Sequence, residues 1–192
     1  LARVLDPAVQ QCPRALFDLG HRHRAHGVQD SYQTAVLPPS LRGKIVLVAP
    51  EIPHNTGAIG RTCVAMNLEL ILIKPYGFSL SEKTVIRAGT RYWQHVRLCE
   101  YENWQSFLED RQPAQDDLYL FEEHGQQSFY EPVYKDDGYL VFGCESAGLP
   151  KEVMLGREDR IFHVPMRNPV VKSLNLSNVA TAVIYQAMRP FL

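Results

Sequence analysis

The chain has 192 residues, of which 45% are hydrophobic, and this length and composition predict a globular protein with a substantial core. Its 20 basic and 21 acidic residues give a net charge of −1, which excludes the strongly basic overall composition typical of many nucleic-acid-binding proteins. No apolar stretch is long enough to cross a bilayer, and the first residues lack the pattern of a secretory signal, so we expect no membrane role.

The first 43 residues differ from the rest of the chain. They lack clear periodicity, contain four prolines and carry the run His21-Arg22-His23-Arg24-Ala25-His26. Histidines on a polar segment are more often solvated than metal-bound, so we assign no metal site. We predict an appendage over 1–43 and a separate domain over 44–192. Acidic residues in the appendage argue against a transit peptide, and the cysteines form no Cys-x-x-Cys pair, so we expect a cytoplasmic protein, with an organellar location left open.

From residue 44 onward, short apolar runs alternate with segments whose apolar residues recur every three or four positions. The runs predict strands and the periodic segments predict helices. The predicted strands are 44–49, 69–73, 95–99, 118–121, 139–142 and 160–164. The predicted helices are 57–66, 81–88, 102–110, a short one after Pro150, and a last one that begins at Leu176 and is stopped by Pro190. This alternation predicts an α/β protein with a mostly parallel sheet flanked by helices.

The first loop of interest, Pro50 to Arg61, follows the first predicted strand and enters a helix, with Asn55 or Thr56 as the expected N-cap. Arg61 lies about one turn into that helix among apolar neighbours, which favours a specific role. Its guanidinium could hold a phosphate with two parallel donors. Because a guanidinium stays protonated near neutral pH, any role in removing a proton is indirect.

The second loop, Gly143-Cys144-Glu145-Ser146-Ala147-Gly148-Leu149-Pro150, follows an apolar strand. Its two glycines permit backbone conformations and close approaches that side chains would block. The spacing does not fit the Gly-x-Ser-x-Gly motif of hydrolases, a Walker loop or Gly-x-Gly-x-x-Gly. Taken alone, the pattern fits a simple tight turn equally well.

The third loop, Ser173-Leu174-Asn175-Leu176-Ser177-Asn178, places polar side chains at the start of an otherwise apolar helix. Taken alone, an N-cap role and a ligand-binding role are about equally supported. All three loops follow strands, and ligands of parallel α/β sheets bind at the carboxyl ends of the strands. The three loops are therefore expected to converge on one edge of the sheet.

Charge is unevenly distributed along the chain. Between Lys74 and Arg97 five basic residues face one acid, whereas the stretch from Glu100 to Glu123 has eight acids and one arginine. A run of this kind is usually a solvated surface, but a local basic patch is enough to attract phosphate, so it gives weak support for RNA binding.

Taken in order, the three loops resemble the motifs of the SPOUT-class RNA 2′-O-methyltransferases. The matching residues are Asn55-Thr56-Gly57 through Arg61, then Gly143-x-Glu145-x-x-Gly148-Leu149-Pro150, then Ser173-x-Asn175-Leu176-Ser177-Asn178. The stretches 75–78 and 87–92 also resemble the branch that methylates the wobble ribose of tRNA. The resemblance covers about residues 44–188.

The resemblance implies a deep trefoil knot in the C-terminal half, a homodimer, S-adenosyl-L-methionine as cofactor and tRNA as substrate. It also implies that Arg61 of one subunit reaches toward the cofactor of the other. The implied catalytic residues are Arg61, Asn55, Ser173 and Asn178. The implied cofactor contacts are Phe121, Gly143, Glu145, Gly148, Leu149, Val164, Met166, Ser173 and Leu174. Within this picture, we expect Glu145 to hold the second loop by accepting backbone amides.

Two features depart from the related branch. Ala147 stands where a basic residue is common, and the loop between Pro165 and Ser173 is one residue longer. Arg167 and Lys172 in that loop could compensate for the missing charge. Three alternatives stay open: methylation of another tRNA position or of ribosomal RNA, a non-catalytic RNA-binding homologue, and a dinucleotide-binding oxidoreductase. The last is disfavoured because no glycine fingerprint follows the first strand.

Overall fold

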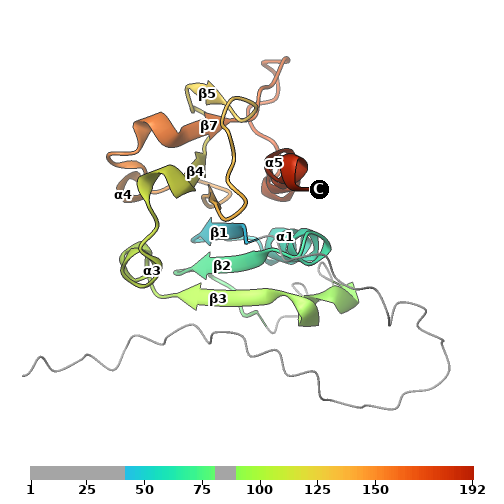
Figure 1. Ribbon diagram of the computed structural model, residues 1–192. Helices are drawn as coiled ribbons and strands as arrows, with labels where there is room; N and C mark the ends of the chain where they lie inside the picture. The colour runs from blue at the N-terminus through green and yellow to red at the C-terminus, as the bar shows by residue number, and fades with distance from the viewer. Residues whose placement is uncertain (1–41, 81–89) are drawn as a thin grey trace, which may run out of the picture. The chain divides into compact units, whose positions relative to one another are not determined.

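The structure is a computed structural model that describes residues 42–80 and 90–192 (Figure 1). All but the last two residues of the appendage predicted over 1–43 lie outside the described residues. The helix predicted over 81–88 lies outside them entirely. The division of the chain at residue 43 therefore stays a prediction.

Within the described residues, one sheet contains all the strands, in the order β3-β2-β1-β6-β4-β7-β5. Every neighbouring pair is parallel, which confirms the predicted α/β class. The strands are β1 (Lys44–Val48), β2 (Glu69–Ile73), β3 (Arg97–Tyr101), β4 (Leu118–Phe121), β5 (Gln127–Ser128), β6 (Tyr139–Phe142) and β7 (Ile161–His163). β3 begins two residues later than predicted, and the short β5 was not predicted.

The α-helices are α1 (Pro53–Ala65), α3 (Trp104–Arg111), α4 (Lys151–Met154) and α5 (Leu176–Met188), and the short 3-10 helices are η1 (Thr90–His95), η2 (Gln115–Asp117), η3 (Glu158–Arg160) and η4 (Arg189–Phe191). Helices α1 and α5 pack against each other (Figure 1). Helix α1 begins four residues earlier than predicted, with Pro53 at a position where its missing N–H costs nothing. None of the described helices combines the length and apolar character needed to cross a bilayer.

The two faces of the sheet pack against different helices because successive strand residues point to opposite sides. On one face, Ile45 and Leu47 of β1 join the core with Ile59 of α1 and Val183 of α5. On the other face, the Phe107 ring of α3 lies edge-on to Tyr139, with ring centroids 5.5 Å apart. Both faces are therefore covered, as expected for a parallel sheet.

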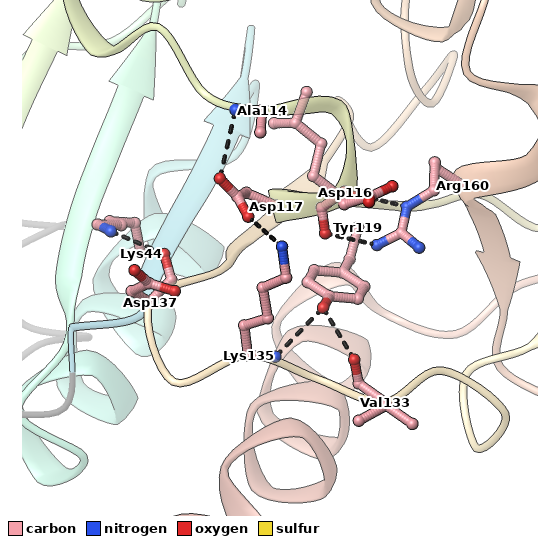
Figure 2. Close-up of polar contacts among 10 residues, drawn as sticks. Lys44, Ala114, Asp116, Asp117, Tyr119, Val133, Lys135, Asp137 and Arg160 are labelled. Atoms are coloured by element: carbon pink, nitrogen blue, oxygen red, sulfur yellow. Dashed lines mark hydrogen bonds and ion pairs between the residues drawn. The ribbon is translucent and has the colours of Figure 1, made fainter.

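A polar network joins the amino ends of the strands to the neighbouring loops. Lys135 Nζ donates to Asp117 Oδ1 over 2.6 Å, and the buried Tyr119 hydroxyl donates to the Val133 carbonyl over 3.0 Å. Figure 2 shows these contacts together with the other labelled members, Lys44, Ala114, Asp116, Asp137 and Arg160. Because all strands run parallel, this network and the three motif loops lie at opposite edges of the sheet.

Candidate active site

A cavity of about 580 Å³ lies at the carboxyl ends of β4, β6 and β7. Phe121, Phe142 and Phe162 from the three strands line it, and the rings of Phe121 and Phe142 are stacked with centroids 4.9 Å apart. The volume lies within the range of about 300–1,000 Å³ that is typical of small-molecule sites. All three motif loops contribute to the walls, which confirms their predicted convergence on one edge.

The second loop is a tight turn in which two glycines touch. The Cys144 N–H donates to the Gly148 carbonyl over 3.1 Å, and the Gly148 N–H donates to the Cys144 carbonyl over 3.0 Å. A Cβ on Gly143 would lie 2.0 Å from the Gly148 carbonyl carbon. Gly148 has a φ of +69°, and a Cβ there would lie 2.3 Å from Glu122 Oε2. Both positions therefore require glycine, one for close approach and the other also for its conformation.

A chain of hydrogen bonds joins one residue from each motif loop. Asn55 Nδ2 donates to Glu145 Oε1 over 2.9 Å, and Asn175 Nδ2 donates to Asn55 Oδ1 over 3.0 Å. Asn55 is only 2% exposed, so its amide would be costly to leave without partners. The Glu145–Asn55–Asn175 chain fastens the three loops into one unit.

Two carboxylates strengthen the link between the first and second loops. Glu145 Oε2 accepts the Glu51 N–H over 2.8 Å and Glu145 Oε1 accepts the Ile52 N–H over 3.3 Å. In return, the Glu51 carboxylate accepts the N–H of Ser146 over 2.9 Å and its hydroxyl over 2.7 Å. Glu145 thus accepts backbone amides as expected, and because these amides belong to the first loop, it holds the second loop by fastening it to the first.

The prediction that Asn55 or Thr56 caps helix α1 is wrong. The N-cap of α1 is Ile52, which makes no side-chain capping bond, whereas Asn55 and Thr56 are buried inside the helix. The Glu145 carboxylate, contributed by another loop, lies at this helix start instead. A negative charge is favourable there because the helix dipole is positive at its amino end.

The third loop serves both as a cap and as part of the site. Asn175 is the N-cap of α5, and its Oδ1 accepts the Ser177 N–H over 2.9 Å and the Ser177 hydroxyl over 2.6 Å. The remaining donor, Nδ2, is the group that binds Asn55. Asn175 therefore caps α5 and also lines the cavity, whereas a ligand-binding role of this loop stays a prediction.

The structure brings some of the predicted residues to the cavity and leaves others outside it. Arg61 is exposed on α1, and its guanidinium lies 5.3 Å from the centroid of the Tyr92 ring. Asn178 is exposed on α5, and Leu149 is buried behind the second loop. None of these three lines the cavity. The predicted residues that do line it are Asn55, Phe121, Gly143, Glu145, Gly148, Val164, Met166, Ser173 and Leu174.

Sequence reasoning missed the segment directly after β4. Glu122, Glu123 and His124 all line the cavity. Glu122 Oε2 accepts the Leu149 N–H over 2.8 Å, which ties this segment to the second loop. Their position at the carboxyl end of a predicted parallel strand could have indicated a place in the site. They were missed because they belong to none of the three motifs.

The chain is similar to known proteins over most of its length. Residues 43–185 match the SpoU rRNA Methylase family. A tRNA (cytidine(34)-2′-O)-methyltransferase from Burkholderia cenocepacia is 36% identical over 147 residues, which are 76% of this chain and 93% of the relative. A protein of Geobacillus stearothermophilus given the same activity in its name is 40% identical over 148 residues, 76% of this chain and 92% of its own.

A solved structure described as "Structural insights into the 2-OH methylation of C/U34 on tRNA" is also similar. It superimposes with a TM-score of 0.72 at 39% identity, covering 78% of this chain and 95% of its own. More than nine-tenths of the length of each of these proteins is thus matched by about three-quarters of this chain.

Proposed function

Because the chain belongs to the SpoU rRNA methylase family, we propose that it transfers the methyl group of S-adenosylmethionine to the ribose 2′-hydroxyl of nucleotide 34 in tRNA. The names of the relatives from Burkholderia cenocepacia and Geobacillus stearothermophilus support this substrate, since the similarity covers almost their full length. Nucleotide 34 is the wobble position of the anticodon. The substrate is tRNA, so we place the reaction in the cytoplasm.

The Glu145–Asn55–Asn175 chain is the observation that supports the proposal best. Methyl transfer needs the accepting oxygen, the methyl carbon and the sulfur in line, and positioning can contribute a large share of such a rate. Three loops that are hydrogen-bonded to one another hold the cavity walls at fixed separations. We assign Asn55, Glu145 and Asn175 this positioning role.

The cavity residues fit S-adenosylmethionine. Met166 and Leu174 offer exposed apolar surface for an adenine ring, and the second loop brings backbone groups to the wall between Gly143 and Gly148. The residues proposed to hold the cofactor are Phe121, Gly143, Val164, Met166, Ser173 and Leu174, all on the cavity wall. When bound, the cofactor supplies an electrophilic methyl group on a sulfonium. Gly148 lines the same wall, and Leu149 supports it from behind by donating its N–H to Glu122.

Arg61 is proposed to act from a second copy of the chain. In one protomer its guanidinium is exposed and outside the cavity wall, so a homodimer that brings it to the neighbouring cavity would complete the site. There it would orient the ribose hydroxyl and an adjacent phosphate while remaining protonated. We also propose that the chain forms the trefoil knot of the family, and that Ser173 and Asn178 contact the substrate.

Basic residues beside the cavity are proposed to contact the RNA backbone. Arg167 and Lys172 are exposed, and they lie between the cavity-lining residues Met166 and Ser173. Their charges would attract phosphate, which Ala147 in the second loop cannot do.

A full-length tRNA with a single 2′-deoxy substitution tests the function most directly. Labelled methyl from S-adenosylmethionine should enter unmodified tRNA and appear in the 2′-O-methylated nucleoside from position 34. The same tRNA assembled with a 2′-deoxynucleotide at position 34 should accept no label, because the reacting oxygen is missing. Label that persists in the deoxy substrate, or that enters ribosomal RNA instead, would assign the activity to another nucleotide.

A further inference from the structure

The ionisable side chains of the cavity wall are nearly all acidic. Glu122, Glu123 and Glu145 line it, and His124 is the one potentially basic side chain among them. No lysine or arginine of the described residues belongs to the wall. The cavity thus presents negative charge to whatever it binds.

Two of the three carboxylates are already engaged by the protein. Glu145 accepts the N–H groups of Glu51 and Ile52 and the amide of Asn55. Glu122 accepts the Leu149 N–H over 2.8 Å and the Glu123 N–H over 3.2 Å. These bonds hold the loops together, so both side chains are fixed in the wall.

Glu123 differs from these two carboxylates because its contact is with an exposed side chain, that of His124. Its Oε1 lies 3.2 Å from His124 Nε2, and the two side chains are 40% and 85% exposed. Such exposed pairs contribute little and are readily given up. Glu123 is therefore the wall carboxylate that is free to face a cation in the cavity.

The proposed reaction changes the charge of the cofactor. Transfer of the methyl group breaks its bond to sulfur and forms a bond to the ribose oxygen, and the hydroxyl proton goes to solvent. The cationic sulfonium becomes the neutral thioether of S-adenosylhomocysteine. A nearby carboxylate attracts the first form and has no such attraction for the second.

We propose that Glu123 makes the cavity discriminate by charge, so that it binds S-adenosylmethionine in preference to S-adenosylhomocysteine. This inference rests on the proposed function. Glu123 would then favour replacement of the product, S-adenosylhomocysteine, by a new molecule of S-adenosylmethionine. The contribution is moderate because water partly screens an exposed carboxylate.

Calorimetric titration of the full chain with three ligands tests the inference. The ligands are S-adenosylmethionine, S-adenosylhomocysteine and sinefungin, which carries an ammonium group near the position of the sulfonium methyl. The variants are Glu123→Gln, Glu123→Asp and the control Glu152→Gln, an exposed carboxylate on α4 outside the cavity wall.

Glu123→Gln should weaken binding of S-adenosylmethionine and sinefungin by about three- to tenfold while changing the affinity for S-adenosylhomocysteine by less than about twofold. Glu123→Asp should keep most of the preference, and Glu152→Gln should match the parent. In the parent, the preference should shrink as salt is added, because mobile ions screen an exposed carboxylate.

Equal weakening of all three ligands would overturn the inference, because the carboxylate would then contact a group that donor and product share. An unchanged ratio in Glu123→Gln would overturn it as well, while leaving the proposed function standing. Failure of the parent to bind S-adenosylmethionine at all would instead overturn the proposed function, and this inference with it.

Discussion

Among single residues, Arg61 carries the largest share of the proposed chemistry. Arg61→Ala should lower kcat at saturating tRNA and cofactor by about a hundredfold or more, because it removes a charge that contacts the reacting groups. Arg61→Lys should recover part of this loss, since it restores the charge without the planar pair of donors. Single-turnover methyl transfer measures both variants.

The control for Arg61 is Arg42→Ala. Arg42 forms an exposed ion pair with Asp136 at 3.3 Å, so its loss should leave the rate unchanged. If Arg61→Ala transferred methyl groups at the rate of the parent, the catalytic assignment would be wrong, and the dimer-borne site would lose its main support.

Two glycines with the same backbone conformation allow a matched test of the second loop. Gly148 and Gly156 have φ values of +69° and +72°, but a Cβ on Gly156 would meet open space, whereas one on Gly148 would strike the Glu122 carboxylate. Gly156→Ala should cost about 1 kcal/mol of unfolding free energy from backbone strain alone. Gly148→Ala should cost about 2–3 kcal/mol, since the Glu122 hydrogen bond to Leu149 is also lost. Denaturant unfolding measures both variants. Equal losses of unfolding free energy would mean that the second loop shifts to accommodate the added methyl group without losing the Glu122 hydrogen bond.

Among the helices, α3 and α5 begin with equivalent caps but differ in what the cap touches. Asn103 accepts the Ser106 N–H over 2.8 Å and serves only α3, whereas Asn175 also binds Asn55. Asn103→Ala and Asn175→Ala should each lower the unfolding free energy by about 1 kcal/mol. Only Asn175→Ala should also reduce kcat/KM for methyl transfer, by about tenfold, because the loops lose their link.

Parallel assays of stability and methyl transfer separate the two effects. Comparable activity in both variants would show that Asn175 acts on the helix alone, and that the Glu145–Asn55–Asn175 chain does not position the site.

The elements that the sequence predicts well are those with a strong local signal. The buried parallel strand β4 is a continuous apolar run, and β2 is one after its first residue, Glu69; the predicted bounds of both strands match the structure. β5 has two residues and no such run, so only its pairing with β7 defines it. The start of α1 was misplaced because its capping carboxylate comes from Glu145, 94 residues away from Glu51 in the chain.

The same limit explains which of the predicted site residues lie outside the cavity wall of a single protomer. Convergence of the three loops follows from parallel strands, and it was predicted. The distance of a side chain from the cavity depends on how far along a helix it lies, however. Arg61 is eight residues beyond Pro53 in α1, which is about 12 Å along the helix axis. Asn178 lies on the first turn of α5 but points to solvent, a direction set by how α5 packs on α1.

In the described part of the molecule, the carboxyl ends of the strands form the cavity and the amino ends carry the polar network of Lys135 and Asp117. Unfolding measured in acid should show how much this network stabilises the fold. The Lys135 ammonium donates a hydrogen bond to Asp117 and lowers the pKa of that carboxyl. A lowered pKa in the folded state means that the stabilisation is present above the pKa of the unfolded state, about 3.9, and is lost as pH falls through the folded value.

Asp117→Asn should therefore lower stability slightly near neutral pH, and its difference from the parent should shrink as pH falls below the unfolded-state pKa and through the lowered folded-state pKa of Asp117. Methyl transfer at neutral pH should not change, because Asp117 lies at the edge opposite the cavity. Asp116→Asn is the control, since Asp116 takes part in the network through its backbone carbonyl. Denaturant unfolding at a series of pH values is the measurement, and a difference that persisted in acid would contradict the assignment.

The hydrogen bonds around Asn55 also determine when the site can exist during synthesis of the chain. Asn55 is separated from Glu145 by 90 residues and from Asn175 by 120. Contacts between such distant residues form late, because the intervening chain must be made and folded first. A nascent chain that has not yet released α5 from the ribosome would hold a nearly complete sheet but no finished cavity. The hydrogen-bonded chain through Asn55 therefore cannot close, and the cavity walls cannot be joined, until Asn175 has been made.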